Sequence, residues 1–128
     1  MTYYISKIVD YSFDDALIKV QDELKKEGFG VLTEIDVQAT LKNKLNVDFR
    51  KYKILGACNP PFAHKAISAE DKIGILLPCN VIVQETQDNK IEIAIMNPIV
   101  AMQSVKNEKL GPIAEEVLGK LQKVYQQL

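Results

Sequence analysis

The C-terminal end of the chain carries the pattern that most constrains the fold. Apolar residues recur there at alternating steps of four and three: Leu110, Ala114, Val117, Leu121, Val124 and Leu128. This spacing places one apolar stripe along an amphipathic helix, which we expect to begin at about Glu108. The stripe is shorter than the three or four heptads that a coiled coil requires, so we expect it to be buried against a sheet.

Segments rich in alternating or β-branched residues supply that sheet. We expect strands over residues 3–9, 31–37, 52–58, 73–77, 81–85 and 90–96. Pro78, Cys79 and Asn80 are expected to join two of them, and Pro78 indicates a sheet edge or a bulge because proline donates no ladder hydrogen bond. Asp88 and Asn89 are expected to turn the chain into the last strand.

Three further helices are expected between the strands. The first follows Ser12, which lies three residues before an acidic side chain in a variant of the capping signal, and it stops at Gly28. A short second helix ends near Asn46. The third begins after Asn59, because Pro60 suits a first helical position and asparagine suits the cap.

Length and composition indicate one domain over residues 1–128. A chain of 128 residues can bury one core but is too short for two, and no repeat or linker divides it. Its 47% hydrophobic and 26% charged residues are typical of globular chains. A block of strands with interspersed helices and one long helix at the end predicts an α+β fold, an antiparallel sheet packed against helices.

Charge and terminal sequence exclude several classes of function. Sixteen basic and seventeen acidic side chains give a net charge of -1 without a basic block, so we expect no nucleic-acid partner. Residues 1–7 do not resemble the start of a signal peptide, and no run of eighteen apolar residues follows, so we expect neither export nor membrane spanning. Without a secretion signal, the two cysteines are expected to be reduced thiols in the cytoplasm.

Two cysteines in similar contexts give the strongest functional indication. Each precedes an asparagine and lies within two residues of a proline, in Cys58-Asn59-Pro60 and in Pro78-Cys79-Asn80. Cys58 ends an expected strand just before an expected helix, where backbone N–H groups and the helix dipole would lower its pKa. The break between strands at Pro78 could bring Cys79 beside it.

These residues admit four interpretations. A redox pair would use one thiolate to attack and the other to resolve. A metal or haem-like site would add His64, the only histidine, but the spacing lacks the paired ligands of strong zinc motifs and no metal is predicted. A binding pocket would present the amides of Asn59 and Asn80 to a small ligand. In the fourth interpretation the cysteines pack as small hydrophobes and the asparagines cap a helix and a turn.

The remaining polar motifs do not predict chemistry. Glu34 and Asp36 lie two residues apart on an expected strand, which is typical of its solvated side. Gly28 and Gly30 lack the third glycine of a phosphate-binding loop. The nucleophile elbow, the zinc-binding helix motif and the P-loop are all absent, and the sequence names no cofactor.

Specific blocks extend over nearly the whole chain. They are Gly28-Phe29, Glu34-Ile35-Asp36-Val37, Lys44, Tyr52-Lys53-Ile54-Leu55-Gly56-Ala57-Cys58-Asn59-Pro60, Ala63 and Ile73-Gly74-Ile75-Leu76-Leu77-Pro78-Cys79-Asn80-Val81. This set resembles the bacterial and archaeal family of domains of unknown function numbered 302. The resemblance implies a TATA-binding-protein-like α+β fold, with a curved antiparallel sheet and helices on one face, found as a homodimer. It implies no activity, and His64 stands where relatives would carry an aromatic or other large residue.

The leading hypothesis is a small dimeric binding or sensor module. Its pocket for a small-molecule ligand would lie around Cys58, Asn59, Cys79 and Asn80, with His64 as a further candidate ligand-binding residue. The alternative is a thiol-dependent redox enzyme in which Cys58 and Cys79 are the catalytic candidates. A third hypothesis is a structural subunit that acts through a partner and exposes an apolar patch.

Overall fold

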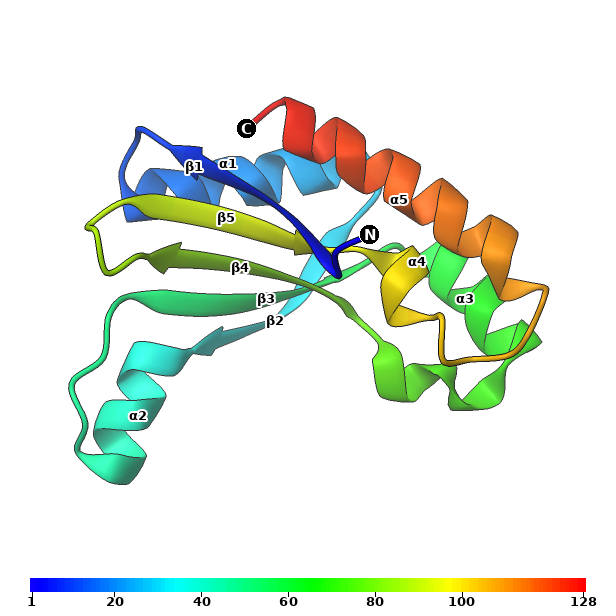
Figure 1. The fold of residues 1–128 in the computed structure, drawn as a ribbon, viewed down its shortest axis with the longest axis horizontal. Coiled ribbons are helices and arrows are strands. Elements are labelled where there is room, and N and C mark those ends of the chain that lie inside the picture. Colours follow the sequence, from blue (N-terminus) through cyan, green and yellow to red (C-terminus); the bar gives the residue numbers. More distant parts are fainter.

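A computed structural model describes all of residues 1–128 and contains one antiparallel sheet packed against helices (Figure 1). The strands are β1 (Tyr4–Val9), β2 (Gly30–Asp36), β3 (Tyr52–Cys58), β4 (Cys79–Glu85) and β5 (Ile91–Met96), and their order across the sheet is β1-β5-β4-β3-β2. The helices are α1 (Phe13–Lys26), α2 (Val37–Leu45), α3 (Pro60–Ala69), α4 (Pro98–Ala101) and α5 (Leu110–Gln126), with a 3₁₀ helix, η1 (Asp71–Leu76). The predicted α+β fold with a long C-terminal helix is confirmed.

Local signals set the limits of α1 as predicted. The Oγ of Ser12 accepts a hydrogen bond from the backbone N–H of Asp15 at 3.0 Å, which satisfies one of the unpaired donors at the helix start. Gly28 follows the helix with a φ of 85°, a left-handed conformation that glycine adopts without strain. Between these limits the predicted apolar stripe is buried, with Phe13, Ala16, Leu17, Val20 and Leu24 facing the sheet.

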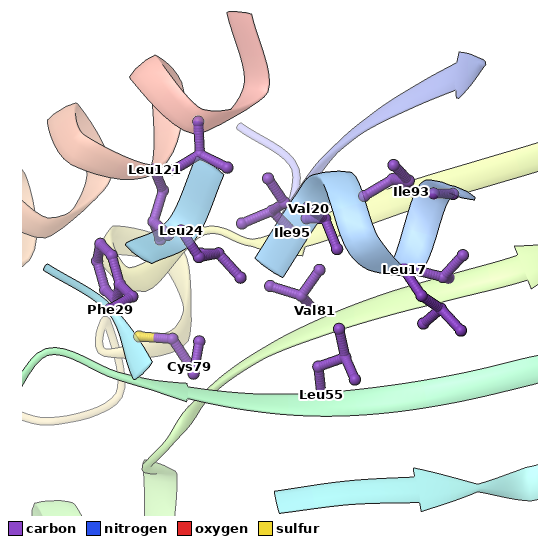
Figure 2. Close-up of a cluster of buried hydrophobic side chains, with 14 of the residues drawn as sticks. Leu17, Val20, Leu24, Phe29, Leu55, Cys79, Val81, Ile93, Ile95 and Leu121 are labelled. Carbon is purple, nitrogen blue, oxygen red and sulfur yellow. The ribbon is translucent and has the colours of Figure 1, made fainter. Parts of the chain in front are cut away.

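The core lies between the sheet and the two helices α1 and α5, which share one face of it (Figure 1). Alternate residues of the central strands point into this layer and are buried there: Leu55 and Ala57 of β3, Cys79, Val81 and Val83 of β4, and Ile93 and Ile95 of β5. Figure 2 shows Val20, Leu24 and Leu121 from the helices beside Val81 and Ile95 from the sheet. Burying each such side chain contributes about 1.5 to 3 kcal/mol, so this layer is the main source of stability.

The predicted stripe of α5 is confirmed. Leu110, Ala114, Val117, Leu121 and Val124 are all buried, whereas Leu128 lies beyond the helix and is half-buried. At its C-terminal end, the ammonium group of Lys7 donates to the carbonyl oxygens of Tyr125 at 2.9 Å and of Leu128 at 3.4 Å. A cation at this position complements the helix dipole and ties β1 to α5.

The opposite face of the sheet has no helix across its centre. It is flanked by α2 at one end and by η1 at the other (Figure 1). Apolar side chains reach solvent there, with Ile8 51% and Ile35 48% exposed. Helix α2 buries none of its own residues against the chain. We call this surface the open face.

Three predictions about local structure are wrong. Residues 73–77 form most of η1 rather than a strand, because a short apolar run lacks the period that separates the two forms. Cys79 and Asn80 begin β4 rather than joining two strands. Strand β4 is central, so Pro78 marks no sheet edge; it precedes the ladder and its missing N–H removes no hydrogen bond from it.

The end of β2 also differs from the prediction. Asp36 is the N-cap of α2, and its side chain accepts a hydrogen bond from the N–H of Ala39 at 2.9 Å. Val37 is therefore the first helical residue rather than the end of a strand. The neighbouring carboxylate, Glu34, forms an ion pair with Lys53 at 2.9 Å. Neither carboxylate lies in the cavity described below.

None of the helices combines the length and the apolar composition that crossing a bilayer requires.

Candidate functional site

The principal candidate site is an apolar cavity where the ends of β3 and β4 meet α3, α4 and α5. Its volume is about 300 Å³, at the lower end of the range for small-molecule pockets. Fourteen of the eighteen residues that line it are hydrophobic, two are prolines, and the only polar ones are Thr33 and Asn59. We refer to it as the end cavity.

Small side chains on facing elements leave this space. Ala57 lies on β3, Ala63 and Ala66 lie on α3, and Ala114 lies on α5, and all four line the end cavity. Larger residues at these positions would close the gap between the helices and the sheet, because side chains in protein interiors normally fill such space. The cavity therefore results from alanines placed opposite one another on separate elements.

Asn59 is the one polar side chain buried in the cavity wall, with 8% of its surface exposed. It occupies the N-cap position of α3, but its side chain makes no capping hydrogen bond, contrary to the predicted role. Its Nδ2 instead donates to the carbonyl oxygen of Glu27 at 3.2 Å. A Cβ on Gly28 would lie 3.1 Å from this nitrogen, so the glycine allows the close approach. This hydrogen bond thus links the start of α3 to the C-terminal end of α1.

Cys58 and Cys79 lie on adjacent strands, and both line the end cavity as free cysteines. The register pairs Cys79 with Ala57, so Cys58 is offset from it by one position. Successive strand residues point to opposite faces, and Ala57 and Cys79 share the helix-covered face. The side chains of the two cysteines therefore leave opposite faces of the sheet, and the predicted cysteine pair is not supported.

The environment of Cys79 disfavours its thiolate. The side chain lies at the edge of the core with its sulfur directed toward Phe29 (Figure 2). Burial raises the pKa of the Cys79 thiol to about 11, and the nearby Cys58 adds a smaller contribution in the same direction. Cys79 is thus a protonated thiol at neutral pH.

The expected cluster of N–H donors near Cys58 is missing. Helix α3 starts with Pro60 and Pro61, which carry no N–H group. The N–H of Ala63 donates to the carbonyl oxygen of Asn59 at 2.9 Å and is thereby occupied. The strand-to-helix junction was predicted correctly, but it offers few donors to a thiolate.

The structure does not bring His64 and Asn80 into the end cavity. His64 is exposed on α3, and Asn80 is exposed on the open face, because it alternates with the buried Cys79 and Val81. Of the predicted site residues, only Cys58, Asn59 and Cys79 line the cavity together. The chain contains no group of three or more histidine, cysteine, aspartate or glutamate side chains placed to hold a metal ion.

Other lining residues were not predicted from the sequence. Ala66 and Ala114 lie on α3 and α5, where each is part of an ordinary helical stripe, and Met102 is the C-cap residue of α4. Alanine at a stripe position is the only sequence signal for the cavity. It becomes informative only once the facing elements are known.

A second hollow of about 760 Å³ lies on the open face. Tyr4 and Asn80 lie on its wall. A chain of hydrogen bonds crosses it, from Arg50 Nε to Gln84 Oε1 at 3.1 Å and from Gln84 Nε2 to Glu92 Oε1 at 2.8 Å. These polar groups are satisfied by one another, so this hollow offers fewer free partners to a ligand than its size suggests.

Comparisons with known proteins agree on the family and the fold. The sequence model described as "Domain of unknown function DUF302" matches residues 5–128. The crystal structure of an uncharacterized conserved protein DUF302 from Bacillus stearothermophilus is similar, with a TM-score of 0.91 and 24% identity over 99% of this chain and 98% of that one. At that identity the likeness establishes the fold alone. No protein with a curated description matches the chain.

Proposed function

The chain belongs to the DUF302 family of domains of unknown function, and we propose that it is a small-molecule binding or sensor module whose ligand occupies the end cavity beside Cys58, Asn59 and Cys79. The observation that supports this proposal is the cavity itself. The cavity is half open to solvent, so its apolar lining contacts water when no ligand is bound, and covering that lining with an apolar ligand is favourable. A hollow of about 300 Å³ beside the core therefore favours an occupant.

The construction of the walls also supports a binding role. Rigid elements hold the lining residues, since the walls come from strand ends and from α3, α4 and α5. The hydrogen bond from Asn59 to Glu27 fixes the start of α3 at the cavity wall. A preformed site of this kind lowers the entropic cost of binding.

The test uses a variant that fills the cavity. Ala114→Leu adds bulk to the α5 wall, and Gln122→Leu places the same residue on the exposed side of the same helix as a control. Each protein is purified without added ligand and extracted with organic solvent, and the extract is analysed by mass spectrometry. We expect an organic molecule to accompany the wild type and the control in stoichiometric amounts and to be lost from Ala114→Leu. Equal amounts in all three proteins, or none in the wild type, would contradict the proposal.

We do not extend the proposal to a thiol-dependent redox enzyme. Such an enzyme would need Cys58 and Cys79 to exchange a disulfide through a thiolate. The side chains leave opposite faces of the sheet, and burial keeps Cys79 protonated at neutral pH. The two thiols instead contribute weakly polar surface to the cavity wall.

We also propose that the module acts as a homodimer through its open face and α2. Helix α2 has nine residues and buries none of them, and isolated helices of fewer than about twelve residues are marginal in water. The open face exposes Ile8 and Ile35. In a two-fold dimer one copy could cover both surfaces of the other, because such an interface is self-complementary.

The dimer is tested by light scattering coupled to size exclusion. We expect the mass of two chains for the wild type and of one chain for Ile35→Glu. Ile18→Glu is the matched control, because Ile18 is equally prominent in solvent but lies on α1, away from the open face. A monomeric wild type, or a dimer that persists in Ile35→Glu, would refute this interface.

We further propose that residues 1–128 act as one domain and that the protein works in the cytoplasm. All the strands belong to one sheet, which supports a single domain. A reducing compartment such as the cytoplasm would keep both free cysteines as thiols.

A further inference from the structure

We propose that the end cavity binds an uncharged, mainly apolar molecule whose hydrogen-bond donor is met by the side-chain oxygen of Asn59. This inference rests on the proposed binding function and specifies the chemical class of the ligand. Three features of the cavity carry it: the absence of charge from its wall, the free acceptor on Asn59, and the apolar rim.

The first feature excludes a buried charge on the ligand. No aspartate, glutamate, lysine, arginine or histidine lines the end cavity. Removing an ionised carboxylate, ammonium or phosphate from water costs several kcal/mol unless a counter-charge or several hydrogen bonds replace the water. The wall supplies neither, so the part of the ligand inside the cavity is neutral.

The second feature selects a hydrogen-bond donor. Asn59 is buried, and its Nδ2 already donates to the carbonyl of Glu27. Its Oδ1 makes no capping hydrogen bond to α3 and is not among the side-chain atoms sealed from solvent without a partner, so it remains accessible as an acceptor. Since the amide oxygen can only accept, the matching ligand group is a hydroxyl or an N–H. Thr33, the other polar residue of the wall, lies on β2 and is exposed to solvent.

The third feature extends the apolar surface beyond the cavity. Leu32 is 71% exposed and Ile67 is 46% exposed, and both line the opening. Large apolar side chains in solvent beside a pocket favour a ligand that continues as hydrocarbon rather than as a polar tail. One water molecule occupies about 30 Å³ in the liquid, so the cavity itself holds roughly ten non-hydrogen atoms.

The test compares three probes of similar size that differ in one group. They are 1-octanol, octanoate and 1-methoxyheptane, which carry a donor, a charge and an acceptor without a donor. Dissociation constants are measured by nitrogen-15 NMR titration, which also reports on the Asn59 side-chain amide. We expect 1-octanol to bind at least about tenfold more tightly than octanoate, because a buried unpaired charge costs more than 1.4 kcal/mol. We expect a roughly fivefold advantage over 1-methoxyheptane, the size of one net hydrogen bond.

Each outcome separates this inference from the function on which it depends. Equal or tighter binding of octanoate would overturn the neutral-ligand inference while leaving a binding cavity intact. Equal binding of 1-methoxyheptane would overturn the role of Asn59 as an acceptor. If none of the three probes shifts the wild-type resonances, both the inference and the proposed function fail. Gln122→Leu, on the exposed side of α5 and outside the cavity, serves as the variant control, and the preference among the probes should survive it.

Discussion

Cys79 is the antiparallel partner of Ala57, the residue immediately before Cys58. Ala57 and Cys79 are both buried on the helix-covered face, so this single pairing decides the direction of Cys58. A shift of the β3–β4 register by one residue would set the two cysteines opposite each other. The register therefore separates two thiols whose sequence contexts are nearly identical.

The first prediction follows from this offset. Oxidation by copper phenanthroline should form no disulfide between Cys58 and Cys79, and intact mass spectrometry should show no loss of two hydrogens. As a control, Ala57→Cys combined with Cys58→Ala places a thiol directly opposite Cys79. Paired strand residues have Cα atoms about 4.5 to 5.5 Å apart, within the range of disulfides, so the control should cross-link. A bridged wild type would show that the side chains meet.

The second prediction concerns alkaline pH. The pKa of Cys79 is about 11 in the folded chain against an ordinary value of 9.0. As the pH rises, the unfolded chain therefore loses this proton at a lower pH than the folded chain does. The resulting contribution to the free energy of unfolding is fully present below pH 9 and is lost as the pH rises toward 11. At pH 11 the loss should reach about 2 kcal/mol. Urea unfolding at pH 8, 9.5 and 11 measures it, and Cys79→Ala should decline less steeply. Parallel curves for the two proteins would argue against the raised pKa.

The third prediction concerns Gly56 on β3. A Cβ there would collide with the hydroxyl of Thr33 and would lie 2.8 Å from the Cγ of Pro78. Gly56→Ala should therefore destabilise the fold by about 1 to 3 kcal/mol, because packed neighbours on both sides must move. Gly119→Ala in the interior of α5 meets nothing within 4 Å and should stabilise by about 0.5 to 1 kcal/mol. Chemical denaturation compares the two, and a neutral Gly56→Ala would show that the neighbours adjust freely.

The fourth prediction concerns the cap of α2. Asp36→Ala removes the hydrogen bond to the N–H of Ala39 and should weaken this helix by about 1 kcal/mol. Since α2 buries no residue, amide exchange should accelerate in the helix while the global unfolding free energy changes little. Asp48→Ala is the control, because its exposed ion pair with Lys42 contributes little. Unchanged exchange in α2 would contradict a capping role for Asp36.

Much of the secondary structure could be predicted from local signals. The start of α1 at Ser12, its end before Gly28 and the limits of β3 all match the prediction. These limits depend on hydrogen bonds and turns within about four residues. The strand predicted over residues 73–77 was wrong because local signals are weak there. An apolar run of that length carries no periodicity that separates a strand from a helical turn.

Most of the candidate site escaped prediction because it depends on long-range contacts. Asn59 is a favourable residue for capping its own helix, yet its side-chain amide donates to the carbonyl of Glu27. In the sequence β2, α2 and β3 lie between these two residues. Asn80 resembles Asn59 in sequence but faces the other side of the sheet. The neighbouring residues alone could not distinguish the two asparagines.

By itself, the sequence determined most of the elements of this protein and which stripe of each long helix is buried, because propensity, caps and periodicity act over one or two helical turns. Only the tertiary structure decided that Ala57, Ala66 and Ala114 face one another and leave a cavity, and that one cysteine is sealed at the edge of the core. Strand register and helix packing join residues far apart in the chain, and their energies depend on all the surrounding side chains at once.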